Sequence, residues 1–308
     1  MKLEAALSPS EVLAQVASAL PADVRGNVII IGSLAAGYHF FAGDGARAIR
    51  TKDVDCLFSP HSKAIAAATE VTDQLIKADW KLREDSDWGQ PGNEGDPEEE
   101  LPMVRLRPPG ETTSPWFLEL LSAPPAFEPG APSKKLRRVE TSIGHFAICS
   151  FDFLALAEWQ PLDTVHGVRI ARPEMMALAN LLHHPEIADT LIAGTDYRRC
   201  NKDLGRVLAL AYLTVQRDRR DGAEEFDAWA GRMWIALQDK FGDLAAQLAA
   251  RAGAGLRAVL ESPADLDQAL RIANLGLLAS LDVSVEAFRA TGARVLADVI
   301  EELEAMAR

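Results

Sequence analysis

The chain has 308 residues, of which 48% are hydrophobic and 25% charged, and its formal net charge is −13. This balance is typical of a globular protein with one large domain or two ordinary ones. The negative charge argues against a broad surface that binds DNA or RNA. For the local clusters of lysine and arginine two interpretations remain: a basic groove, or solvent-exposed faces of helices and loops. We expect a cytoplasmic protein with no membrane contact, because no apolar run approaches about 18 residues and the first residues lack a signal-peptide pattern.

The first half of the chain predicts a mixture of helices and strands. Ser8, three residues before Glu11, predicts the capped start of a helix, and a second and a third helix are expected from Ser33 and over 61–79. Short runs rich in β-branched and aromatic residues predict strands, and they lie at 27–32, 53–58, 80–82, 103–107, 116–122, 137–140, 145–150 and 165–171. Between them, the acidic, Gly- and Pro-rich stretch 84–100 predicts a loop.

The character of the chain changes after Arg172. The second half has few strand formers and carries helical periodicity over 173–184, 197–217, 222–241 and 285–308. We therefore predict an α/β domain over 1–172 and a helical domain over 173–308. The three cysteines are far apart and form no metal-binding spacing, which predicts structural thiols.

Two aspartates interrupt the apolar strand predicted at 53–58. Alternate residues of a strand share a face, so Asp53 and Asp55 point one way while Val54, Cys56 and Phe58 point into the core. Two adjacent carboxylates repel each other, and a divalent cation would compensate their charge. Carboxylate oxygens suit Mg²⁺, so the pair predicts a metal site.

Glu119 lies in the middle of another apolar strand. A lone buried glutamate is costly, so it needs a partner. One candidate is a metal shared with Asp53 and Asp55, and the alternative is an ion pair with Arg105 or Arg107 on a neighbouring strand. If Glu119 lies on the opposite face of the sheet from the two aspartates, the shared metal site is excluded.

Gly32 and Ser33 lie where the first strand turns into a helix. Backbone N–H groups at a helix start attract phosphate, and a glycine lets the phosphate approach closely. A phosphate cradle beside a metal-binding pair suits nucleotide chemistry.

This order of motifs resembles the nucleotidyltransferase superfamily of the DNA polymerase β type. Its pattern is an apolar strand, Gly-Gly or Gly-Ser, a helix, Asp-x-Asp on the next strand and a later acid, matched here by Gly32, Ser33, Asp53, Asp55 and Glu119. Thr51 matches a hydroxyl often found before the first aspartate. The segments "RIARPEMMALANLL" and "YRRCNKDLGRVLAL" look like the bacterial branch that includes the AbiEii-type toxins of type IV toxin–antitoxin systems, although Asn180 stands where that branch often has a lysine.

The resemblance implies an α+β fold: a nucleotidyltransferase-type mixed sheet with flanking helices, followed by a C-terminal helical bundle. It implies Mg²⁺- or Mn²⁺-dependent transfer of a nucleoside monophosphate from an NTP to a hydroxyl of RNA, protein or a small molecule. Asp53, Asp55 and Glu119 would be the catalytic metal ligands. Gly32, Ser33, Thr51 and Lys202 would bind the nucleotide, although Lys202 pairing with Asp203 is an equal alternative.

The toxin-like branch also implies an antitoxin-like partner. Two other hypotheses remain. The chain could be a catalytically inactive protein of the same fold that binds a partner protein, or a metal-dependent nuclease, which explains the carboxylates but not the Gly-Ser turn.

Overall fold

The computed structural model describes residues 6–43, 47–82, 90–110, 116–128, 132, 134–187 and 190–308. These residues form two compact units. The sheet unit holds the described parts of Glu4–Tyr38 and Thr51–Ala171, and the helical unit holds those of His39–Arg50 and Arg172–Arg308. The chain therefore passes from sheet to helices between Ala171 and Arg172, while the earlier segment His39–Arg50 is grouped with the helices.

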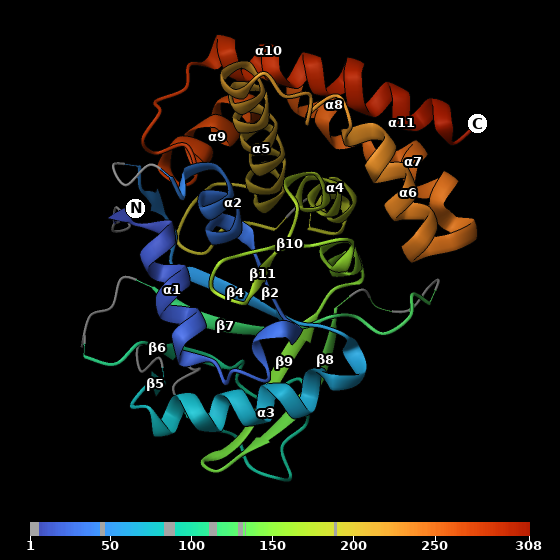
Figure 1. Cartoon of the computed structure of the whole chain (residues 1–308). Helices are drawn as coiled ribbons and strands as arrows, with labels where there is room; N and C mark the ends of the chain where they lie inside the picture. Colours follow the sequence, from blue (N-terminus) through green and yellow to red (C-terminus); the bar gives the residue numbers. More distant parts are fainter. Residues whose placement is uncertain are drawn as a thin grey trace. The chain divides into compact units, whose positions relative to one another are not determined.

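The sheet unit is built on a mixed sheet of nine strands within the described residues (Figure 1). At its centre, β4 (Asp53–Phe58) runs antiparallel to β2 (Val28–Ile31) and parallel to β7 (Phe117–Ser122). The sheet continues from these three strands through β5 (Lys81–Leu82), β6 (Arg105–Arg107), β8 (Lys135–Thr141), β9 (Gly144–Ser150), β10 (Leu162–Asp163) and β11 (Arg169–Ile170). The two-residue strands β1 (Ala6–Leu7) and β3 (Ile49–Arg50) are not part of it.

The helices of the sheet unit follow from their sequences. Helix α1 (Pro9–Ala19) begins as predicted, since the Ser8 hydroxyl accepts a hydrogen bond from the Glu11 backbone N–H. Helix α2 (Gly32–Phe41) starts directly after β2, and its last three residues are grouped with the helical unit. Helix α3 (His61–Lys77) turns an alanine-rich stripe toward β4, β7 and β8, and Figure 1 shows it lying along the sheet. Short 3₁₀ turns cover Arg25–Asn27 and Asp152–Glu158.

Every strand predicted in the first half is present, although several are shorter than expected, and the two-residue strands β1, β3 and β10 were not predicted. The predicted loop at 84–100 falls partly outside the described residues, at 84–89. Its described part, 90–100, contains no helix or strand, and it is held to β9 by two backbone hydrogen bonds between Gly92 and His145. The loop is therefore anchored at this point.

The helical unit is centred on α5 (Arg199–Asp221), which packs against α4 (Pro173–His183), α8 (Ala254–Glu261), α9 (Pro263–Leu275) and α10 (Val285–Val295). The other helices are α6 (Trp229–Phe241), α7 (Ala245–Ala252) and α11 (Glu301–Met306), with a π-helical turn at Leu296–Ile300 and 3₁₀ turns at His184–Ile187 and Gly242–Leu244. The prediction of a helix from residue 222 is wrong at its start. Helix α5 runs on to Asp221 and ends at Gly222, whose φ of +67° suits a glycine, so α6 begins only at Trp229.

The coarse fold prediction is confirmed: a mixed sheet and flanking helices form one part of the chain, and a set of helices forms the other. Among the described residues, none of the helices has the length and apolar character needed to cross a bilayer. The three cysteines are buried thiols, and burial raises the pKa of each, as expected for structural residues.

Candidate metal centre on the sheet

Asp53, Asp55 and Glu119 meet on one face of the sheet. In the parallel pairing of β4 with β7, Asp55 stands directly opposite Glu119, while Asp53 lies two residues earlier and therefore on the same face. One carboxylate oxygen from each residue lies within 4.8 Å of the others, and all three side chains are half-buried. The structure therefore satisfies the condition that Glu119 share a face with the two aspartates.

The apolar residues between the acids fix this arrangement. Val54 and Cys56 are fully buried on the other face of β4, and Leu118 and Leu120 are buried in the same way on β7. A slip of one residue in either strand would expose these side chains and bury the acids. The packing of the core therefore determines which side the carboxylates occupy.

Gly32 lies directly against Asp55. Its φ is +71°, and a Cβ atom built on it would lie only 2.6 Å from Asp55 Oδ2. Any side chain here would be strained by the backbone and would push the carboxylate away. The Gly-Ser turn and the second aspartate are thus parts of one site, with half-buried Ser33 in the first turn of α2.

Thr51 orients Asp53. The Thr51 hydroxyl is buried and lies 2.9 Å from Asp53 Oδ1 and 3.0 Å from the Asp53 carbonyl oxygen. A hydroxyl in this position donates to the carboxylate and restricts its rotation. The sequence prediction placed Thr51 with the nucleotide, whereas in the structure it contacts the first aspartate.

Glu119 also has an arginine partner. Arg105, on the antiparallel strand β6, stands opposite Glu119, and its Nη2 donates to Glu119 Oε1 at 3.0 Å. Both side chains are largely buried, at 21% and 14% exposed, so the contact is more than a surface ion pair. The ion pair and the acid cluster, weighed as alternatives from the sequence, are both present. Arg105 therefore offsets part of the negative charge of the cluster.

The remaining predicted residue, Lys202, lies on α5 in the helical unit, where its side chain is half-buried. The alternative partner proposed for it, Asp203, has its Oδ2 3.3 Å from His183 Nδ1. Asn180, which replaces an expected lysine, donates to the Met176 carbonyl of its own helix at 2.8 Å.

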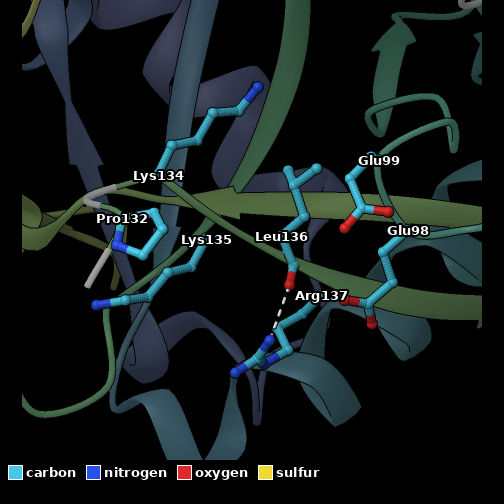
Figure 2. Close-up of a pocket in the computed structure, with 7 residues that line it drawn as sticks. All are labelled: Glu98, Glu99, Pro132, Lys134, Lys135, Leu136 and Arg137. Carbon is cyan, nitrogen blue, oxygen red and sulfur yellow. Dashed lines mark hydrogen bonds between the residues drawn. The ribbon is translucent and has the colours of Figure 1, made fainter.

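A pocket of about 390 Å³ elsewhere in the sheet unit is lined by residues of both charges (Figure 2). Glu98 and Glu99 lie at one end, and Lys134, Lys135 and Arg137 lie along the rest of it. Lys135 is already paired with the buried Asp152, at 2.6 Å. Because its charges offset one another and no member of the acid cluster lines it, this pocket is not the candidate centre.

Comparisons of the chain with family models, with curated proteins and with solved structures find no match. The functional argument therefore starts from the acid cluster itself.

Sequence reasoning found the three acids and named Arg105 among the candidate partners of Glu119, but it missed the contact of Gly32 with Asp55 and the hydrogen bond from Thr51 to Asp53. The contact of Gly32 with Asp55 depends on how β2 pairs with β4, and no local pattern encodes that pairing. Arg105 could be named from the sequence only as one of two arginines, because the pairing register of β6 with β7 selects it over Arg107.

Proposed function

We propose that this chain is a divalent-cation-dependent nucleotidyltransferase that moves a nucleoside monophosphate from an NTP to an acceptor hydroxyl. The observation that carries the proposal is the convergence of Asp53, Asp55 and Glu119 within 4.8 Å on one face of the sheet, with Gly32 packed against Asp55. The order of elements around it, strand, Gly-Ser turn, helix and Asp-x-Asp strand, supports the nucleotidyltransferase fold.

The donor set fits a hard divalent cation. Mg²⁺ and Mn²⁺ take oxygen ligands, and Mg²⁺ is typically held by one or two carboxylates together with substrate phosphates. Three half-buried carboxylates at this spacing repel one another, and the ion pair of Glu119 with Arg105 offsets part of that charge. A bound cation would supply charge neutralisation at the triphosphate and orient the reacting oxygens.

The chain's own residues would position the reactants. Asp53 and Asp55 would hold the cation, with the Thr51 hydroxyl restricting Asp53. The backbone N–H groups at the start of α2 and the Ser33 hydroxyl would receive the terminal phosphates.

In the proposed reaction, the acceptor oxygen forms a bond to the α-phosphorus and the bond from that phosphorus to its leaving oxygen breaks. The acceptor hydroxyl loses its proton to Glu119 or to water, and pyrophosphate leaves. Most of the catalysis would come from positioning and charge neutralisation, as is general for transfer at phosphorus.

The second candidate is a catalytically inactive protein of the same fold that binds a partner, such as an antitoxin-like protein. The ion pair between Arg105 and Glu119 favours it, because an arginine can take the place of a cation beside an acid. The two candidates differ in metal binding. The first requires Mn²⁺ to bind at the acid cluster, and the second does not.

The experiment incubates the protein with labelled NTPs, Mg²⁺ and total RNA. It compares the wild type with Asp55→Asn, which keeps the shape of the side chain, and with Asp163→Asn, an exposed acid on β10 that serves as control. Label in RNA, protein or a small molecule, lost only in Asp55→Asn, supports the proposal. Shortened RNA indicates a nuclease, and absence of both products together with absent Mn²⁺ binding indicates the inactive protein; either result refutes the proposal.

A further inference from the structure

A second pocket lies wholly within the helical unit and differs in character from the acid cluster. It has a volume of about 250 Å³, and its described lining includes three arginines and three aromatic side chains but no acid: Phe40, Phe41, Arg47, Tyr212, Arg217 and Arg220. On a chain with a net charge of −13, such a lining is a local concentration of positive charge. It attracts an anion that also presents a flat apolar surface.

The spacing of residues on α5 builds one wall of this pocket. Tyr212, Gln216 and Arg220 are four residues apart and share a face of the helix, and Arg217 lies beside them. The neighbouring Arg219 is exposed and does not line the pocket. The arginines that line the pocket are therefore selected by helical periodicity rather than by the basic stretch as a whole.

Arg217 is held in place by a neutral group. Its Nη1 lies 2.7 Å from His39 Nε2 and 3.3 Å from the His39 carbonyl oxygen. Since an arginine only donates, Nε2 must accept, and the imidazole is neutral. Burial, followed by the charge of Arg217, lowers the pKa of His39 to about 4, which agrees with this geometry. The guanidinium is thus oriented without losing its charge.

Two of the arginines in this pocket share an acidic neighbour. Asp221 lies 3.5 Å from Arg217 Nε, and it accepts hydrogen bonds from Arg220 Nε at 2.7 Å and Arg220 Nη2 at 3.1 Å, so this exposed carboxylate pairs with both arginines. Arg172 and Glu225 also act on His39, with opposite signs. Arg47 adds a third positive charge to the pocket, over the ring of Phe41 at 5.6 Å.

The aromatic side chains give the pocket a flat wall. The ring of Phe40 packs edge-to-face on His39, with centroids 4.7 Å apart, and so its orientation is fixed. Tyr212 lies on α5 and is half-buried. Aromatic faces of this kind stack on nucleobases, and guanidinium groups bind phosphate through paired hydrogen bonds.

We propose that this pocket binds a nucleoside phosphate, with the phosphate on Arg217 and Arg220 and the base against Phe40 and Tyr212. Its volume is slightly below the roughly 300 Å³ at which sites for drug-sized ligands begin, which suits one nucleotide unit. The unit comes either as a free mononucleotide or as the phosphorylated end of a nucleic acid strand. The pocket shares no lining residue with the acid cluster, and the proposed binding needs no metal ion.

The test measures the binding of AMP, adenosine, inorganic phosphate and a 5′-phosphorylated tetranucleotide to the full chain by titration calorimetry, with EDTA present. We expect AMP to bind more tightly than either adenosine or phosphate. The Kd for AMP should rise about tenfold in Arg217→Gln and in Arg220→Gln, and it should stay unchanged in Arg219→Gln, the matched control on the same helix. If the tetranucleotide binds more tightly than AMP, the ligand is a strand end; otherwise it is a mononucleotide.

Two results would overturn the proposal. One is AMP binding that Arg219→Gln weakens as much as Arg217→Gln does, because the attraction would then be general. The other is AMP binding that is absent, or that Asp55→Asn abolishes in EDTA, because the pocket would then bind no nucleotide. If the transferase proposal fails, label transfer is absent but AMP still binds in EDTA. The two failures can therefore be distinguished.

Discussion

Replacing Gly32 with alanine tests the geometry on which the metal centre depends. The added Cβ would lie 2.6 Å from Asp55 Oδ2, whereas ordinary contact begins at 3.4 Å, so the carboxylate must move by about 0.8 Å. Metal–ligand distances tolerate only about 0.2 Å, so we expect Mn²⁺ affinity to fall at least about tenfold. The φ of +71° adds about 1–2 kcal/mol of backbone strain to the folded state.

The matched control for this substitution is Gly222→Ala. Gly222 has a φ of +67°, and a Cβ there meets nothing within 4 Å, so this variant carries the same strain without a clash. Mn²⁺ affinity from titration calorimetry and unfolding free energy from urea denaturation are measured for both variants. Both should lose similar stability, and only Gly32→Ala should lose metal affinity. Equal Mn²⁺ affinity in Gly32→Ala and the wild type would refute the reasoning.

Three further substitutions probe single contacts. Arg105→Gln removes the group that competes with a cation for Glu119, so the Kd for Mn²⁺ should fall. The metal-free protein should lose about 1 kcal/mol of unfolding free energy. Weaker Mn²⁺ binding by the variant would contradict this competition. Thr51→Val removes the hydroxyl that is hydrogen-bonded to Asp53 and should lower the free energy of unfolding, measured by urea denaturation, by about 1 kcal/mol. Thr51→Ser keeps the hydroxyl and should keep the stability. If the serine variant is no more stable than the valine variant, the hydrogen bond is excluded as the cause. Burial lowers the pKa of His39 from 6.5 to about 4, so between these pH values the unfolded chain binds a proton that the folded chain does not. The free energy of unfolding should therefore fall by up to about 3 kcal/mol as the pH drops from 6.5 to 4. His39→Gln should make the free energy of unfolding, measured by urea titration, less dependent on pH in this range. If the pH dependence is unchanged in the variant, it arises from other groups.

The elements of the fold could be predicted where local pattern and burial agree. The apolar runs that became β2 and β4 are bounded by turn residues, and β4 has the bounds expected for it, Asp53–Phe58. The two-residue strand β10 carries no such pattern, because its pairing partner and not its own sequence defines it. The predicted end of α5 was wrong because the charged residues at 217–220 are compatible with either a helix or a loop.

The candidate site was predictable in part for a different reason. A carboxylate in an apolar strand is costly, so Asp53, Asp55 and Glu119 could each be singled out without knowing the fold. Their closeness to Arg105 and Gly32 depends on strand register, which is a property of the whole sheet. The pocket on α5 could not be predicted at all, because His39 and Arg217 are separated by most of the chain.

Asp55 and Glu119 are paired residues of two neighbouring parallel strands. The site is therefore sensitive to some changes in chain length and insensitive to others. The connection over residues 59–116 joins these strands, and lengthening a loop within it adds only a small entropy cost. One residue inserted within β7 ahead of Glu119 would instead turn that carboxylate to the opposite surface. Natural variation in length should therefore accumulate in the connector and be absent from the two strands.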